Sequence, residues 1–408
     1  MGERAGTEAD AIAGVVPRRV FEPASVAEAV EAVALCARDR LALGFIGGGT
    51  DLGLGGAPTA LDAVLRTGGL SRVLEYAPAD QVVVVEAGAT LAGLAPQLAA
   101  HGQWLALDPP WPDRATVGGV VAANAFGPRR ARYGSARDLI LGVTMVRADG
   151  VEARAGGKVV KNVAGFDLPR LMVGALGSLG LLTTVTFRLH PRPEAAATVL
   201  FPAVDAAQAS SLGAAWREAQ LEPTSAAALV ASERLDLGVR FEGFAPGVAG
   251  QAGRLVELGR RAGAGGERLG EEEARAFWAR HDAARASGPL RVKVAAPPSR
   301  LPQVVRSVLP PLLGVLSAAA AVWYPSLGLG FVGGRPPPGL SAAAAVEEAR
   351  GGATALGGSL VVLDAPHDVR AAVDVWGPPP PAHDLMQQLK NRLDPDRRLN
   401  RGRFVGGL

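Results

Sequence analysis

Cysteine is almost absent from this chain of 408 residues, in which Cys36 is the single example. One cysteine excludes an internal disulfide, a cluster held by several cysteines and a zinc site built on them. Cys36 lies near an apolar stripe of Val26, Val30 and Val33 at helical spacing, and nothing cationic adjoins it in the sequence. We therefore expect a buried, unreactive thiol.

Long apolar runs and blocks of basic residues are also lacking. The best apolar stretch, residues 309–324, contains Pro310, Pro311 and Gly314 and is too short to span a bilayer. Residues 1–14 have no apolar core followed by a cleavage site, so we predict a frayed N-terminus without a signal peptide. The formal net charge is only +3, which disfavours nucleic acid as a partner. These absences favour a cytoplasmic protein with no transmembrane segment.

Glycine is abundant instead, with 53 residues, and it is concentrated in the stretch from Ala115 to His190. The middle of this stretch alternates in polarity on both sides of Asp149-Gly150, a pair typical of a hairpin turn. Its flanks are poor in side chains. Such backbone can bring main-chain N–H groups onto a diphosphate or a flat ring system, whereas for any single Gly pair a tightly packed turn is the alternative.

Four segments of this stretch resemble one family as a set. They are TVGGVVAAN, GPRRARYGSARDLILG, GGKVVKNVAGFDLPRLMVG and GSLGLLTT. They resemble the FAD-binding subunit of bacterial glycolate oxidase, within the vanillyl-alcohol oxidase and p-cresol methylhydroxylase (PCMH) superfamily. The resemblance implies an α+β fold: a two-subdomain PCMH-type FAD-binding domain over residues 1–194, a cap domain with an antiparallel sheet over residues 195–376, and a C-terminal segment over residues 377–408 that packs back on the FAD-binding domain.

A further Gly-rich segment precedes this stretch. A short predicted strand runs directly into a loop formed by Gly47, Gly48, Gly49, Thr50 and Asp51. A strand followed by a Gly-rich turn suits a phosphate cradle. The loop is neither a Walker loop, because no Gly-Lys-Ser/Thr follows, nor a Rossmann fingerprint, because the glycine spacing differs. By resemblance it lies over the FAD diphosphate, and a plain surface turn is the alternative.

The resemblance also assigns the rest of the cofactor site. Asp108 and Pro109 lie near the ring edge, and main-chain groups at Leu181 meet the adenine. Asp167 borders the flavin, although it is also a natural N-cap for a helix over residues 168–176. The other residues that the resemblance assigns to FAD are Thr116, Gly118, Gly119, Ala122, Asn124, Gly134, Asp138, Gly165, Gly180, Asn400 and Arg403.

Two loops of the same region carry several basic residues. Arginines at positions 129, 130, 132 and 137 could neutralise a diphosphate, dock an acidic partner or form a solvated loop. Asp138 closes this loop, and we expect it to cap a helix or to pair with one of these arginines. Lys158, Lys161 and Asn162 open the segment that borders the flavin by resemblance.

The second half of the chain alternates predicted strands and helices in two rounds, which predicts the antiparallel sheet of the cap. Residues 328–333 match G-x-G-x-x-G, but prolines follow where a dinucleotide fingerprint needs a helix, so we discount the match. The tail predicts one helix over residues 382–393. With the turn that follows, it resembles the closing motif of the family, except that Arg401 stands where proline is usual.

Side chains suited to catalysis are scarce. Related catalytic subunits carry a His-rich H-x-GDGN-x-H motif in the cap, whereas His281, His367 and His383 are scattered here. We assign no catalytic base; Tyr324, Lys293 and His281 are the weak candidates that a self-sufficient enzyme would use. No histidine or cysteine occurs in the Gly-rich segments, so we expect FAD to be held non-covalently.

Three functions stay open. The leading hypothesis is the FAD-binding subunit of a glycolate oxidase/dehydrogenase-like complex that oxidises a small 2-hydroxy acid. Its partners would be a catalytic FAD-linked 2-hydroxy-acid oxidase subunit and an iron–sulfur subunit, through which the chain would be peripheral to the inner membrane if it is not simply cytoplasmic. The alternatives are a self-sufficient FAD-dependent 2-hydroxy-acid or alcohol dehydrogenase and a non-catalytic assembly subunit whose flavin fold is vestigial.

Overall fold

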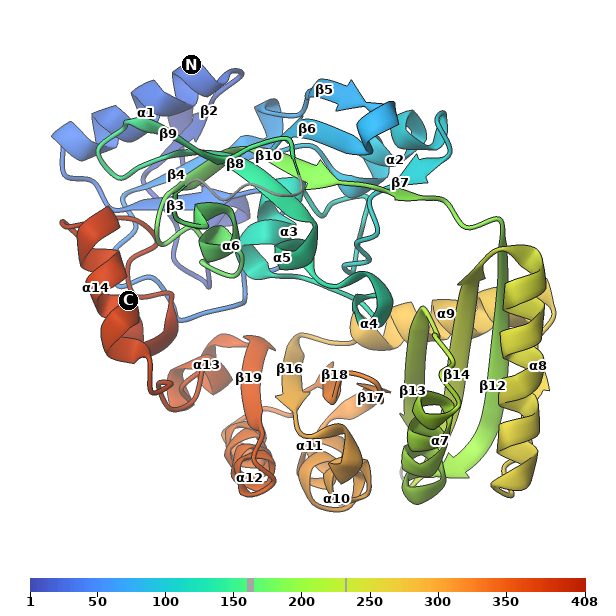
Figure 1. Ribbon diagram of the computed structural model, residues 1–408. Helices are drawn as coiled ribbons and strands as arrows, with labels where there is room; N and C mark the ends of the chain where they lie inside the picture. Colours follow the sequence, from blue (N-terminus) through green and yellow to red (C-terminus); the bar gives the residue numbers. More distant parts are fainter. Residues whose placement is uncertain (160–164, 232) are drawn as a thin grey trace. The chain divides into compact units, whose positions relative to one another are not determined.

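The computed structural model describes residues 1–159, 165–231 and 233–408 (Figure 1). They form two compact units. The first unit comprises Met1–Gly127, Gly134–Arg192 and Pro378–Leu408, and the second comprises Pro128–Tyr133 and Pro193–Gly377. Residues 128–133 therefore belong to the second unit, although the sequence analysis included them in the first domain. No helix in the described ranges is long and apolar enough to cross a membrane.

A small mixed sheet opens the first unit. Its strands, in the order β1-β2-β4-β3, are β1 (Gly2–Ala5), β2 (Arg19–Glu22), β4 (Ala63–Arg66) and β3 (Leu43–Ile46). Ser25 caps helix α1 (Val26–Arg38), because its side chain accepts a hydrogen bond from the amide of Glu28. The helix buries Val33 and Cys36 against this sheet. The prediction that Cys36 is buried is confirmed, and burial raises the pKa of its thiol to about 11, which disfavours the reactive thiolate.

The N-terminus is ordered, so the prediction that residues 1–14 fray is wrong. Strand β1 pairs with β2 in antiparallel register, and the carboxylate of Asp10 is fully buried beside it. Asp10 accepts hydrogen bonds from Arg4 at 2.7 Å and from Arg66 at 2.7 Å, and the bond from Arg4 lowers the pKa of this carboxyl. Local sequence gave no sign of these pairs because Arg66 lies 56 residues away.

A five-stranded antiparallel sheet forms the rest of the first unit. Its strands, in the order β5-β6-β10-β8-β9, are β5 (Val73–Ala77), β6 (Val82–Glu86), β10 (Leu181–Arg188), β8 (Ile140–Val146) and β9 (Glu152–Gly156). The predicted hairpin is confirmed: β8 pairs with β9, and Gly150 at the turn has a φ of 83°. The other elements are α2 (Leu91–Ala99), β7 (Gln103–Trp104), α3 (Val117–Ala123), α5 (Ala136–Leu139), α6 (Leu168–Met172), β11 (His190–Pro191) and α14 (His383–Leu393).

An eight-stranded antiparallel sheet organises the second unit, as the alternating pattern predicted. Its order is β15-β12-β14-β13-β17-β18-β16-β19, with β15 (Glu267–Arg268), β12 (Ala195–Asp205), β14 (Arg234–Gly243), β13 (Ser225–Ala231), β17 (Ser317–Tyr324), β18 (Leu329–Arg335), β16 (Leu290–Ala295) and β19 (Ser359–Asp364). Residues 328–333, discounted as a dinucleotide fingerprint, enter strand β18. The helices are α4 (Arg130–Tyr133), α7 (Ala206–Glu218), α8 (Ala245–Arg261), α9 (Glu271–Arg285), α10 (Leu301–Gln303), α11 (Leu309–Val315), α12 (Ser341–Ala355) and α13 (His367–Ala372).

The two faces of this sheet differ. Helices α7, α8, α11 and α12 bury the main core of the unit against one face of this sheet. Trp323, on the strand labelled β17 in Figure 1, belongs to this core. Because side chains alternate along a strand, its neighbour Tyr324 points to the opposite face, which α9 covers in part. The helical stretch from α10 to α11 is interrupted by a π turn at Val304–Val308, directly before the prolines of α11, which lack the N–H that an α-helix requires.

Helix α9 is joined to the sheet by a buried histidine. His281 Nε2 lies 2.8 Å from the hydroxyl of Tyr324, and its Nδ1 lies 2.9 Å from a carboxylate oxygen of Asp282. Burial lowers the pKa of His281, and the hydrogen bond with Asp282 opposes this shift only in part. His281 and Tyr324 were candidate bases, but both side chains are buried and bonded to each other, so they are packing groups in this unit.

A pH dependence of stability follows from His281. In the unfolded chain this imidazole takes up a proton near pH 6.5, whereas in the folded chain its pKa is lower. The free energy of unfolding therefore has its full value above that pH and falls as the pH is lowered from about 7 towards 5. We expect His281→Gln, which retains hydrogen-bonding groups without titrating, to flatten this dependence in urea unfolding. His367→Gln, at an exposed site, is the matched control; an unchanged pH slope in the His281 variant would contradict the assignment.

Candidate FAD-binding site

Gly-rich segments from distant parts of the first unit converge on one cavity. It contains about 830 Å³ of empty space, part of it open to solvent. The loop after β3, the helix α3, the start of β10 and the tail all contribute walls. The predicted cofactor residues that line it are Gly47, Gly48, Gly49, Thr50, Asp51, Gly118, Gly119, Ala122, Gly180, Leu181, Asn400 and Arg403.

Glycine permits this convergence because main chain packs directly on main chain. A Cβ atom on Gly48 would lie 1.6 Å from the carbonyl oxygen of Arg114. One on Gly118 would lie 2.7 Å from the Cβ of Ala87, at the end of β6. Neither neighbour can move without displacing a segment of backbone. The absence of side chains at these two positions therefore brings the walls of the cavity together.

Main-chain donors are available at the loop but not at the start of α3. Within the described ranges, the amides of Gly48, Gly49 and Thr50 donate to no acceptor of the chain. By contrast, Gly118 N donates to Ala87 O at 2.7 Å and Gly119 N to the side chain of Thr116 at 3.3 Å. The amides of Gly118 and Gly119 are thus used within the chain, whereas the successive amides of the loop suit a diphosphate.

The tail closes the cavity beside this loop. The guanidinium of Arg403 donates to the carbonyls of Leu52 at 3.0 Å and Leu54 at 2.5 Å, so it fixes the chain just after the Gly-rich loop. Asn400 donates from Nδ2 to Leu176 O at 2.6 Å. Its other side-chain atom, Oδ1, is buried without a hydrogen-bond partner, and Asn400 lines the cavity. A buried acceptor without a donor is a place where a hydroxyl or N–H of a ligand fits.

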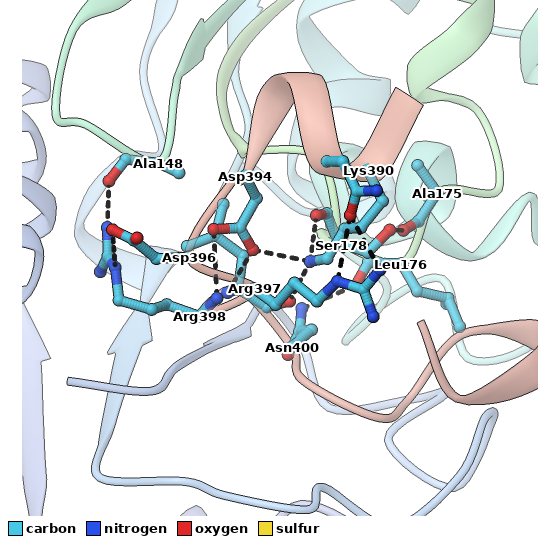
Figure 2. Close-up of polar contacts among 12 residues, drawn as sticks. Ala148, Ala175, Leu176, Ser178, Lys390, Asp394, Asp396, Arg397, Arg398 and Asn400 are labelled. Carbon is cyan, nitrogen blue, oxygen red and sulfur yellow. Dashed lines mark hydrogen bonds and ion pairs between the residues drawn. The ribbon is translucent and has the colours of Figure 1, made fainter. Parts of the chain in front are cut away.

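A buried ion pair holds the tail in this position (Figure 2). The ammonium of Lys390 donates to Asp394 at 2.7 Å, to Ser178 O at 2.8 Å and to Leu399 O at 2.8 Å. Asp394 also accepts the amides of Arg398 and Leu399. All three protons of the ammonium are thus used, which compensates for removing both charges from water. Burial lowers the pKa of Lys390.

Several predicted cofactor residues have structural roles outside the lining of the cavity. Thr116 caps α3 and lies behind the loop, since its hydroxyl would meet a Cβ on Gly47 at 2.3 Å. Asp108 accepts the amide of Gly127 at 2.9 Å, and Pro109 beside it is buried. Asn124 ends α3 with a φ of 48°.

Gly134 and Asp138 also lie away from the cavity. A Cβ on Gly134 would meet Asp138 at 2.6 Å, so glycine there permits a close turn. Asp138 accepts the amide of Ser135 at 2.8 Å and closes the capping box of α5. Of the two roles predicted for Asp138, the carboxylate therefore takes that of a helix cap and not that of an ion-pair partner for an arginine of its loop.

The segment before α6 likewise serves the fold. Asp167 caps α6 through the amide of Arg170 at 3.2 Å, as the structural alternative predicted, and with Gly165 it borders a different, polar pocket. Lys161 and Asn162 lie outside the described residues. Helix α6 ends at Met172 instead of residue 176, because the amides of residues 174 and 176 donate to carbonyls near the end of α3.

Some residues of the cavity gave no signal in the sequence. Apolar lining comes from Ile12, Phe45, Met172 and Leu176. Ile12 belongs to the segment expected to fray, and the others look like ordinary core residues. The arginine loop was an open question: Arg129 pairs with Glu242 at 2.9 Å inside the second unit, so it does not serve the cavity.

The geometry fits the family to which this region is related. Residues 17–156 match the model of a family described as FAD binding domain, so the first unit contains an FAD-binding domain and FAD is its cofactor. The chain is 38% identical over 172 residues to glycolate oxidase subunit GlcE of Escherichia coli (strain K12), covering 42% of this chain and 48% of that protein.

Other relatives extend the comparison. Glycolate oxidase subunit GlcD of Bacillus subtilis (strain 168) is 32% identical over 194 residues, which are 47% of this chain and 41% of that protein. A probable mitochondrial D-lactate dehydrogenase of Danio rerio is 31% identical over 318 residues, 71% of this chain and 63% of that protein. The chain thus spans about half the length of the first two relatives.

A solved structure shares the fold across both units. An alkyldihydroxyacetonephosphate synthase superposes with a TM-score of 0.72 at 16% identity, covering 95% of this chain and 77% of that one. The architecture expected from the sequence, a PCMH-type FAD-binding domain followed by an α+β domain with an antiparallel sheet, is therefore confirmed.

The Gly48 contact gives a direct test of the cavity. We expect Gly48→Ala to force the loop away from Arg114 O and to abolish FAD retention, measured by flavin absorbance after gel filtration. Gly68→Ala is the matched control, because Gly68 lies next to the cavity residue Thr67 but has open space around its Cβ position. Full FAD retention by the Gly48 variant would refute the cradle.

The Lys390 ion pair gives a second test. Lys390→Met leaves the Asp394 carboxylate buried without its cation, and we expect about 3–5 kcal/mol lower stability in denaturant unfolding, with weaker FAD retention. Arg392→Met removes an exposed charge from the same helix and should change little. The double variant Lys390→Met/Asp394→Leu should recover part of the loss, since neither charge is then left unpaired. A single variant as stable as the wild type would contradict the role given to the pair.

Proposed function

We propose that this chain is the FAD-binding subunit of a glycolate-oxidase-like complex that oxidises a 2-hydroxy acid and passes the electrons to a partner subunit. One observation carries the proposal: the loop after β3, with its unused amides, and the tail meet at one cavity in a domain that matches an FAD-binding family. The relatives named glycolate oxidase subunits support the substrate class.

The residues of the cavity then divide the work of holding FAD. The amides of residues 48–50 hold the diphosphate, and Arg403 keeps their loop in place while adding positive charge beside it. Asn400 Oδ1 accepts a hydrogen bond from the cofactor. FAD, when bound, supplies the two-electron acceptor. Among the residues that the structure describes, no histidine or cysteine lines the cavity, which supports non-covalent attachment.

The second unit supports an anionic substrate. On β16 the side chains of Arg291 and Lys293 alternate with buried core residues, so both lie on the face that α9 partly covers, where the guanidinium of Arg291 also pairs with Asp364 at 3.1 Å. Lys293 is in register with Phe331, and the guanidinium of Arg285 lies 3.3 Å from the centroid of that ring. A small 2-hydroxy acid needs such cations for its carboxylate.

Two of the three candidate catalytic bases are unavailable, which favours the subunit hypothesis over an independent enzyme. His281 and Tyr324 are buried and bonded to each other, so neither is available to accept the proton of a substrate hydroxyl. We therefore assign that step to the partner flavoprotein subunit, with an iron–sulfur subunit as the next electron acceptor. A self-sufficient 2-hydroxy-acid dehydrogenase is the second candidate, favoured by the D-lactate dehydrogenase relative whose match extends over 71% of this chain.

Two measurements on the purified chain test the proposal. Acid precipitation should release all of the flavin into the supernatant, because no covalent bond holds it; colour that stays in the pellet would overturn non-covalent binding. Anaerobic addition of glycolate or D-lactate to the isolated, FAD-loaded chain should leave the flavin oxidised, whereas the complex purified from the native host should bleach. Rapid bleaching of the isolated chain would establish the self-sufficient enzyme instead.

A further inference from the structure

A second cavity of the first unit differs in chemistry from the flavin cavity. It lies between α6, the loop that follows it, α14 and the last residues, and it encloses about 660 Å³ of empty space, part of it open to solvent. Most of its lining is apolar, including Leu171, Leu179, Met386, Leu389 and Phe404. The charged side chains of the lining are all cationic, and no aspartate or glutamate lines it within the described ranges. Leu408, the last residue of the sequence, also lines the cavity, and its main-chain oxygen accepts the amide of Phe404 at 2.9 Å.

The three cations of this cavity are not equivalent. Lys390 lies deep, and its ammonium is fully used by Asp394 and two carbonyls. Arg170 is exposed and already pairs with Asp167 at 3.2 Å. Arg137 is also exposed, and its guanidinium has no ion pair or hydrogen bond among the described residues. The opening of the cavity therefore carries positive charge, and the guanidinium of Arg137 is available to a ligand.

One segment of chain separates the two cavities. Met172, Leu176 and Leu181 line the flavin cavity, whereas Leu171, Ala175 and Leu179 line the second one. Residues 171–182 are thus a partition only one chain thick, and Lys390 fixes it through Ser178 O. Each cavity has its own lining, so a ligand in the second cavity does not occupy the site assigned to FAD.

We propose that the second cavity binds an amphipathic organic carboxylate, with its apolar body between α6 and α14 and its carboxylate on Arg137. The binding free energy becomes more favourable with the apolar ligand surface that these walls remove from water. The planar guanidinium of Arg137 matches a carboxylate in two-pronged geometry. An amine is disfavoured by the cations at the opening, and a short acid such as glycolate has no apolar body to fill the walls.

Titration of octanoate into the purified, FAD-loaded full chain tests this site by calorimetry. We expect saturable binding at one site per chain, and much weaker binding of 1-octanol, which has the same body without the charge. Arg137→Gln should weaken octanoate binding about fivefold or more, since it removes the partner of the carboxylate. Arg392→Gln, an exposed arginine of α14 outside the lining, should leave binding unchanged.

A filling variant locates the site independently. Leu389→Trp should abolish octanoate binding while FAD absorbance is kept; if that variant does not fold, Arg137→Gln, which changes only an exposed side chain, still decides the question. The proposal is overturned if octanoate shows no saturable binding, if octanol binds equally well, or if Arg137→Gln binds octanoate as tightly as the wild type. It is also overturned if the folded Leu389 variant binds octanoate normally.

Discussion

The first unit depends on a contact between two stretches of bare backbone. Gly48 lies directly against the carbonyl of Arg114, and Gly118 packs against Ala87. Since neither position has a side chain, the loop after β3 and the start of α3 share one wall of the cavity. The amides of the loop consequently donate to no acceptor among the described residues. The ability of the unit to hold a diphosphate is therefore a consequence of packing as much as of hydrogen-bonding chemistry.

A buried ion pair in the tail stabilises the close packing that the glycines permit. Lys390 joins the helix α14, the partition at Ser178 and the turn at Leu399 through one ammonium group. Removing this ammonium group from water costs free energy, and its hydrogen bonds offset that loss only while all of its partners are in place. The tail is therefore held in a single arrangement, and Asn400 and Arg403 reach the cavity because that arrangement is fixed.

Local chemistry explains how much could be predicted from the sequence. The loop at residues 47–51, the hairpin at Gly150 and the cap at Asp167 were all visible, because each depends on residues a few positions apart. The segments that meet at the cavity were also recognisable as a set. The unused amides were not: Gly48 and Gly118 look alike in sequence, and only the fold decides that the amide of Gly118 is already taken by the carbonyl of Ala87, which is distant in sequence. The same holds for Asp10, whose partner Arg66 is distant in sequence, and for Ile12, which was assigned to a frayed end.

The bond between Arg403 and Leu54 has a consequence for how the protein is made. The two residues are 349 positions apart, so the Gly-rich loop is synthesised long before the arginine that fixes it. At typical elongation rates of about 5–20 residues per second, the interval is roughly 20–70 s. A nascent chain can fold its first sheets in that time, but the pocket lacks one wall until Asn400 and Arg403 have left the ribosome. Completion of the pocket therefore waits for residues made long after its Gly-rich loop.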